Sequence, residues 1–222
     1  MNRLIERFLI LKNNYRNYDT KHALKRIQAF RQAVRELCNK GYPVAIELLG
    51  SISFGIAEPC SDADCVLLHY CDLHQEDGEC PVHCPNLIFE QEEIVKTLKK
   101  KLPGEMFHIE FLDWVNLKYI ENLVKRGQTR DNEIVYRLLY YRTMGRPVNR
   151  PLVVKYCEIL EQDQELMRGF SEWSSAALAA YLETPTHRYS FNKYNERIIN
   201  LGVSLPPELK EELIKYIEDI QL

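Results

Sequence analysis

Two short apolar runs that lie close together in the chain, Val44–Leu49 and Ala63–Leu68, constrain its fold more than any other feature. Apolar runs of about four to eight residues bounded by turn-forming residues are typical of buried strands. In Met106–Leu112 apolar and polar residues alternate instead, which predicts a third strand with His108 and Glu110 on one face. The chain is therefore predicted to contain a small mixed β-sheet.

Most of the remaining chain carries apolar residues at helical spacing. Residues 2–16 and 20–39 precede the first strand, and Phe89–Leu102 connects the second strand to the third. Beyond Val115 the pattern predicts helices near residues 115–126, 131–144, 150–160, 162–182, 188–201 and 206–220. This order predicts an α+β fold, with a sheet-containing domain and its N-terminal helices over residues 1–114 and an all-α C-terminal domain over residues 115–222.

Gly50 and Ser51 stand where the first strand ends and a short segment, Ser51–Ala57, begins. Backbone N–H groups at a helix start have no acceptor within the helix, and the helix dipole adds positive potential there. Glycine lets another group approach the backbone closely, and the Ser51 hydroxyl supplies a further donor. The pair is therefore predicted to bind an anion such as phosphate.

Asp62 and Asp64 stand two residues apart at the start of the second strand, so strand geometry places both carboxylates on one face. Two carboxylates held this close repel each other unless a cation neutralises them, and hard oxygen ligands suit magnesium. Glu110 on the third strand offers a third carboxylate, which would complete a two-metal site. Asp113 and His108 compete with Glu110 for this role, although strict alternation places Asp113 on the opposite face.

The pattern Gly50-Ser51 followed by Asp62-x-Asp64, with Gly55 inside it and Ser61 before the first aspartate, resembles the polymerase-beta-type nucleotidyltransferase superfamily. The likeness is greatest to its small "minimal" and aminoglycoside-type bacterial members. It is carried by residues 44–68 and reaches about residue 113 by element order.

One departure from that family's signature concerns charge. Ser53 and Phe54 stand where alanine and arginine are frequent, while Gly55 and Ala57 match. Without the arginine, either the metal ions or a basic residue elsewhere must balance the charge of a triphosphate.

The resemblance implies a catalytic nucleotidyltransferase core. It implies that Gly50, Ser51 and Ser61 contact the nucleotide, that Asp62 and Asp64 bind two Mg²⁺ ions, and that Glu110 is the third catalytic and metal-binding acid. The implied reaction moves a nucleoside monophosphate from a triphosphate, expected to be ATP, to a hydroxyl of a small molecule or a protein, with release of pyrophosphate. A catalytically degenerate nucleotide-binding protein is the alternative.

A polar loop, Cys71–Pro85, carries a second cluster with possible chemistry. Cysteine and histidine are the ligands that zinc prefers, and a structural zinc could fasten a loop that has too few apolar residues to fold by burial. The alternatives are an acidic loop with reduced thiols and a zinc-dependent interaction site as the working part of the protein. The four candidate zinc ligands are Cys71, His74, Cys80 and Cys84.

Composition narrows the classes of partner. A net charge of −3 and a pI near 6.1 argue against a broad electrostatic grip on nucleic acid. No apolar run approaches the ~20 residues that a membrane-spanning helix requires, and the N-terminal segment reads as an amphipathic helix rather than a signal peptide. A cytoplasmic protein whose seven cysteines are reduced is therefore expected, with no membrane partner.

A tyrosine stripe in the predicted helix 131–144 has two interpretations. Tyr136, Tyr140 and Tyr141, with Arg137 and Arg142 beside them, would suit either base stacking with phosphate binding or a core face bordered by solvated arginines. The core face is the more typical of the two.

Overall fold

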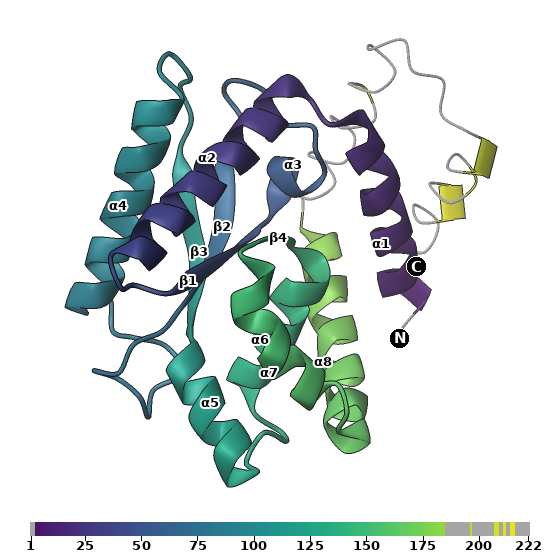
Figure 1. The fold of residues 1–222 in the computed structure, drawn as a ribbon. Coiled ribbons are helices and arrows are strands. Elements are labelled where there is room, and N and C mark those ends of the chain that lie inside the picture. The colour runs from purple at the N-terminus through teal and green to yellow at the C-terminus, as the bar shows by residue number, and fades with distance from the viewer. Residues whose placement is uncertain (1–2, 185–195, 197–206, 209–210, 212–213, 216–222) are drawn as a thin grey trace.

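A four-stranded mixed sheet in the order β3-β2-β1-β4 organises the fold (Figure 1). β1 (Val44–Leu48) is antiparallel to both β2 (Ala63–His69) and β4 (Arg146–Val148), whereas β2 and β3 (Ile109–Asn116) run parallel. A parallel pair needs a crossover connection, and the helix α4 (Pro85–Lys101) supplies it. The sheet is the mixed one that the apolar runs predict.

The computed structural model describes residues 3–184, 196, 207–208, 211 and 214–215. The predicted helices near 188–201 and 206–220 therefore lie largely outside the described residues. The other helices are α1 (Arg3–Tyr15), η1 (Arg16–Tyr18), α2 (Lys21–Asn39), α3 (Gly50–Ser53), α5 (Leu117–Arg126), α6 (Glu133–Met144), α7 (Arg150–Leu160) and α8 (Gln164–Glu183).

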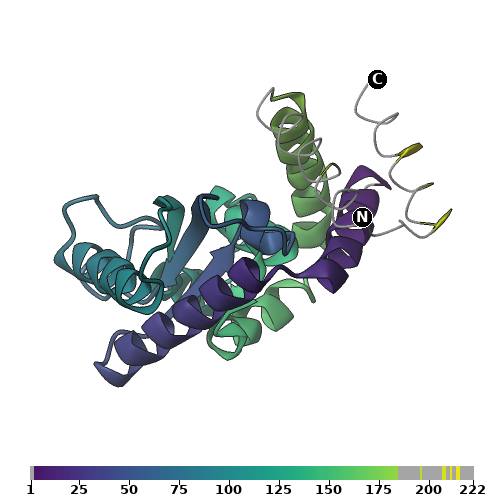
Figure 2. The same cartoon turned by 90° about the horizontal axis from the view of Figure 1, so that it is seen from above.

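Helices cover both faces of the sheet. One core is formed by α2, α4 and the sheet face that carries Ile46, Cys65 and Leu67. The second core lies between the opposite face, with Val66 and Leu68, and the helices α5 to α8. Figure 1 shows the two groups of helices, and Figure 2 shows α1 and α8 beside each other at one end of the molecule.

The C-terminal part differs from the all-α prediction in one element. Residues 146–148 form β4 and pair with β1, so this part of the chain contributes a strand to the sheet. Pro147 lies within β4, and a proline argues against a strand in a sequence pattern because it cannot donate to the ladder. β4 is the edge strand, where the missing N–H group is tolerated.

A β-bulge changes which residues of β3 share a face. Glu110 is in register with Asp64, but Asp113 is in register with Val66, so Leu112 is the extra residue. β3 also begins later and ends later than the predicted Met106–Leu112. The expectation that Asp113 lies opposite Glu110 is therefore wrong, because the bulge returns Asp113 to the Glu110 face.

Within the described part of the chain, none of the helices combines the length and apolar character that crossing a membrane requires.

Candidate functional site

Asp64 lies directly against Gly50. The Gly50 backbone has a φ of +52°, in the left-handed region that favours glycine. A Cβ atom added at Gly50 would overlap Asp64 Oδ2 and lie 3.1 Å from Asp64 Cγ. The Leu49 N–H also donates to the Asp64 carbonyl oxygen at 2.9 Å. The predicted phosphate turn and the predicted metal acid are thus in contact, and the contact requires a glycine.

The three predicted acids meet at the same end of the sheet. Asp64 and Glu110 are register partners on neighbouring parallel strands, so their side chains share one face. Asp62 immediately precedes β2, and its Oδ1 accepts from the His108 N–H at 3.4 Å. Glu110 and Asp62 are exposed, whereas Asp64 is half-buried. The structure therefore brings together the residues Asp62, Asp64 and Glu110.

The charges of these acids have no partner cation in the part of the chain that the structure describes. Among the described residues, no lysine or arginine forms an ion pair with Asp62, Asp64 or Glu110. Burial raises the pKa of Asp64 from 3.8 to about 6, and the charges of Glu110 and then Asp62 add to this effect. A divalent cation would relieve both the burial penalty and the repulsion, and carboxylate oxygens are ligands that a hard metal ion prefers. The ligand oxygens of Asp62, Asp64 and Glu110 do not all lie within 4.8 Å of one another, so the three side chains would have to close around such an ion.

The two serines differ in how they relate to this cluster. Ser51 is buried in the first turn of α3, where backbone N–H groups lack helical acceptors. The Ser61 hydroxyl instead accepts from the Glu58 N–H at 2.9 Å, and the Ser61 N–H donates to the Glu58 carbonyl at 3.1 Å. Ser61 therefore closes the turn that leads into Asp62, and its contact with nucleotide stays a prediction.

Arg26 positions the same turn and was not identified from the sequence. Its guanidinium is fully buried and donates to the carbonyls of Glu58 and Pro59, each at 2.9 Å, and to that of Ser61. Its Nε also donates to Glu105 Oε2 at 3.2 Å. An arginine within an amphipathic helix pattern gives no signal of this role, because its partners are backbone carbonyls far along the chain.

Phe54 stands where the resemblance leads us to expect an arginine, and it packs against α1. It is buried and meets Phe8 and Tyr15 of α1 edge-on, with ring centroids 5.6 Å and 5.8 Å away. A guanidinium does lie beside α3, because Arg16 Nε donates to the Ser53 carbonyl oxygen at 3.0 Å. The motif position thus anchors α1 to α3.

Asp113 shares the Glu110 face but has protein partners. Arg137 Nε donates to Asp113 Oδ2 at 3.0 Å and its Nη2 forms an ion pair with Oδ1. The Tyr141 hydroxyl donates to Oδ2 at 2.5 Å. The tyrosine stripe of α6 is therefore largely a core face, and Arg137 is paired rather than solvated. These partners leave Glu110 as the better candidate for the third metal-binding acid.

These different roles predict that substitutions of Glu110 and Asp113 differ in their effect on the free energy of unfolding. Glu110→Gln is expected to change the free energy of unfolding by less than about 0.5 kcal/mol, because Glu110 is exposed and forms no ion pair with any residue that the structure describes. Asp113→Asn is expected to lower it by about 1–3 kcal/mol, because Arg137 loses a buried charged partner. Denaturant unfolding of both variants measures this difference.

Metal binding should show the reverse pattern. In a magnesium titration, Glu110→Gln is expected to lose magnesium binding, whereas folded Asp113→Asn is expected to retain it. If only the Asp113 variant lost magnesium binding, the two acids would have to exchange roles.

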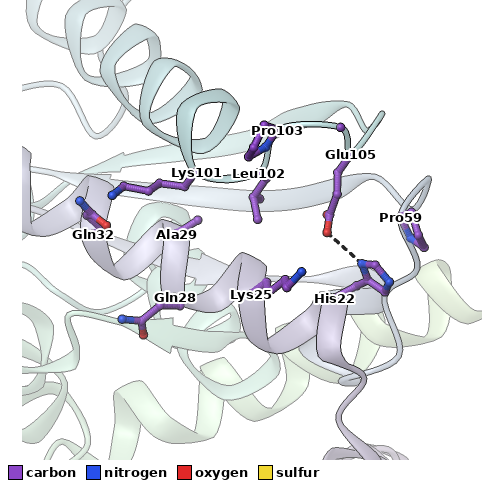
Figure 3. A pocket seen from close by; sticks show the side chains of 11 residues that line it. His22, Lys25, Gln28, Ala29, Gln32, Pro59, Lys101, Leu102, Pro103 and Glu105 are labelled. Atoms are coloured by element: carbon purple, nitrogen blue, oxygen red, sulfur yellow. Dashed lines mark hydrogen bonds and ion pairs between the residues drawn. The ribbon is translucent and has the colours of Figure 1, made fainter.

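A cavity of about 650 Å³ lies on the α2 side of the molecule, apart from the three acids (Figure 3). It is lined by α2 and the turn after α4, and His22 Nδ1 and Glu105 Oε1 lie 2.8 Å apart in its lining. None of the predicted site residues lines it. This cavity is therefore separate from the candidate site formed by the three acids.

The cysteine loop converges on a second centre. The sulfur atoms of Cys71, Cys80 and Cys84 all lie within 4.8 Å of one another, and the three side chains are buried. His74, the fourth predicted ligand, is not part of this group, and its Nδ1 lies 3.5 Å from Asp77 Oδ2. Burial raises the pKa of the Cys80 thiol, and the hydrogen bond with the neighbouring Cys71 thiol raises it further.

A buried histidine–glutamate pair lies near this loop, and no pattern in the sequence predicted it. His69 Nδ1 and Glu90 Oε2 lie 2.8 Å apart, and both side chains are fully buried. Among the described residues, His69 Nε2 and Glu90 Oε1 find no hydrogen-bond partner. The pair links the end of β2 to α4 in the core beneath the cysteine loop.

Comparison with known proteins adds no family assignment. No protein-family model, no curated protein and no solved structure matches this chain.

Proposed function

We propose that this chain is a magnesium-dependent nucleotidyltransferase, which transfers a nucleoside monophosphate from a nucleoside triphosphate to a hydroxyl acceptor. The observation that carries the proposal is the contact between Gly50 and Asp64, with Glu110 in register beside Asp64. It joins a turn suited to phosphate with a cluster of carboxylates suited to magnesium.

Each residue of the cluster has a chemical role in this proposal. Asp62, Asp64 and Glu110 would hold magnesium, and Glu110, or a water molecule on its metal ion, would take the proton of the attacking hydroxyl. The acceptor oxygen forms a bond to the α-phosphorus while the bond from the α-phosphorus to the bridging oxygen breaks, and pyrophosphate leaves. When bound, the metal ions would lower the charge repulsion around the transferring group.

The first turn of α3 would hold the triphosphate. Its free N–H groups begin at Gly50, whose lack of a side chain permits a close approach. The chain's acidic balance favours a small molecule or a protein over an RNA end as the acceptor.

Tyr181 lies in the last turn of α8. Partial burial raises the pKa of Tyr181, and the charge of Asp64 raises it further, so the two side chains are electrostatic neighbours. Tyr181 is 44% exposed, which leaves its ring accessible to a bound molecule. We therefore expect the acceptor or the nucleobase to lie between the acids and α8.

Incubation with α-labelled and γ-labelled nucleoside triphosphates and Mg²⁺ tests the proposal. The α-label is expected to appear in an acceptor from a small-molecule or protein extract, while the γ-label appears in pyrophosphate. The label should stay in the triphosphate when Mg²⁺ is omitted. Transfer of the γ-phosphate, or release of orthophosphate as the first product, would contradict nucleotidyl transfer.

A catalytically inactive nucleotide-binding protein would give a different experimental result. Phe54 is a core residue where the family frequently has an arginine, so one source of positive charge is absent from the motif. A protein that binds a triphosphate with Mg²⁺ but releases no pyrophosphate with any extract would be a nucleotide-binding module. Isothermal titration alongside the labelling experiment separates the two functions.

A further inference from the structure

Three buried thiols converge within the segment Cys71–Cys84. Cys71 is in the chain just after β2, Cys80 lies in the loop, and Cys84 precedes the first residue of α4. All three sulfur atoms lie within 4.8 Å of one another, and the Sγ atoms of Cys71 and Cys84 are 3.8 Å apart. This is the only such group of potential metal ligands among the described residues.

The spacing suits a tetrahedral zinc ion. Zinc–sulfur bonds of about 2.3 Å at tetrahedral angles place neighbouring sulfur atoms about 3.8 Å apart. The Cys71–Cys84 distance already has this value, and the remaining separations would have to close by at most about 1 Å. A disulfide, in contrast, requires sulfur atoms about 2.05 Å apart, and all seven cysteines are free.

The loop has little else to hold it by burial. Its two large apolar side chains point away from the core, because Leu73 is 64% exposed and Val82 is 71% exposed. The cysteines are its inward-facing residues, and their exposure is 2% or less. A segment of this composition loses conformational entropy on ordering that so small a buried surface offsets poorly.

The backbone beside the thiols is held in a fixed arrangement. The Asn116 side chain accepts from the Cys71 N–H at 3.1 Å and donates to the Cys71 and His74 carbonyls. Trp114 Nε1 donates to the Cys80 carbonyl at 2.8 Å. Asn86 Nδ2 also lies 3.6 Å from Cys71 Sγ, in reach of a hydrogen bond to the sulfur. Outer groups of this kind orient metal ligands.

We propose that Cys71, Cys80 and Cys84 bind one zinc ion as thiolates, and that this ion fastens the loop between the end of β2 and the start of α4. The three thiolates select a soft ion such as zinc over magnesium, so this site is chemically distinct from the acid cluster. The remaining tetrahedral position takes a nitrogen or oxygen ligand. The proposal does not rest on nucleotidyl transfer.

The competing explanation is ordinary core packing, since cysteine is among the most buried residue types. Packing predicts three protonated thiols, no bound metal and no effect of a chelator. The two explanations therefore differ in what the purified protein contains.

Metal analysis of the full chain, purified under reducing conditions without added chelator, gives the direct test. One zinc per chain is expected, and the reduced metal-free protein should bind one Co²⁺ with a thiolate-to-cobalt charge-transfer band for three sulfur ligands. A protein that contains no zinc and binds neither Zn²⁺ nor Co²⁺ would overturn the proposal. So would a denatured, unreduced sample with two fewer titratable thiols than the reduced one, because that result indicates a disulfide.

A thermal experiment tests the role of the ion. With excess Mg²⁺ present throughout, a zinc-selective chelator is expected to lower the melting temperature by on the order of 10 °C and to speed proteolysis within residues 72–83. Re-addition of Zn²⁺ should restore both values. A melting temperature unchanged by removal of measured zinc would contradict the fastening role.

Matched variants separate metal binding from loss of a buried side chain. Cys80→Ser should lose zinc and become insensitive to the chelator. Cys157→Ser removes an equally buried thiol on α7, outside the cluster, and should keep both properties. Equal zinc content in the two variants would overturn the assignment. Metal analysis of the wild type decides the proposal even if Cys80→Ser does not fold.

Discussion

Asp64→Asn is expected to eliminate nucleotidyl transfer and at the same time to stabilise the metal-free protein. Activity should fall on the order of 10³-fold or more, because the substitution removes a charged ligand at the centre of the acid cluster. Stability should rise because asparagine has no charge to bury and none to repel Glu110 and Asp62; burial first, and then these two charges, raise the Asp64 pKa. A gain in stability coupled to a loss of function is typical of a site built for an absent ligand.

The pH dependence follows from the raised pKa of Asp64. Between pH 3.8 and about 6 the folded protein keeps the proton on Asp64 while the unfolded chain releases it. This contribution to stability is therefore fully present below pH 3.8 and lost as the pH rises through about 6. The difference corresponds to at most about 3 kcal/mol, and about 1–3 kcal/mol is expected for a half-buried group.

Denaturant unfolding of the metal-free wild type and Asp64→Asn at several pH values measures the effect. The gain in the free energy of unfolding should be small near pH 4 and largest above pH 6. Excess Mg²⁺ should stabilise the wild type only, and its affinity should increase as the pH rises through about 6. Asp72→Asn, at an exposed carboxylate, is the control and should show neither effect. A pH-independent difference would contradict the placement of Asp64 beside other acids.

Gly50→Ala is expected to disable the same site through packing. The new Cβ atom would overlap the Asp64 carboxylate, and the backbone φ of +52° disfavours alanine. Either the acid moves away from its partners or the turn shifts, so magnesium-dependent triphosphate binding should weaken by about 100-fold or more. The free energy of unfolding should fall by roughly 1–3 kcal/mol.

Gly127→Ala provides a close control for backbone strain. Gly127 also has a positive φ, +65°, but a Cβ atom there would meet nothing within 4 Å. It should lower stability through the backbone alone and leave magnesium and triphosphate binding unchanged. If the two variants bound the triphosphate equally well, the Gly50–Asp64 contact would have no part in function. Titration calorimetry and denaturant unfolding on both variants supply the comparison.

Sequence patterns alone located the parts of the candidate site that depend on local geometry. The apolar runs identify β1 and β2 because a short buried strand needs apolar side chains on both faces. The two-residue spacing of Asp62 and Asp64 predicts that they share one face. The glycine before Ser51 suits the turn, where the backbone φ is +52°. The α+β class also follows from element order.

The cysteine loop shows where such patterns stop. Proximity in the chain predicted a group that included His74, whereas the folded loop buries three sulfur atoms together and leaves that imidazole beside Asp77. Which side chains of a loop point inward depends on the backbone path, and here Asn116 and Trp114 of β3 set that path.

Local periodicity in the amino-acid sequence determined the strands β1 and β2, the shared face of the acids and the glycine at the turn, because each depends on neighbours within a few residues. Only the tertiary structure decided that Leu112 forms a bulge, that Asp113 is held by Arg137, that Arg26 supports the turn before Asp62, and that residues 146–148 complete the sheet. These features depend on hydrogen bonds and ion pairs between residues far apart in the chain, which no local pattern of apolar and polar residues encodes.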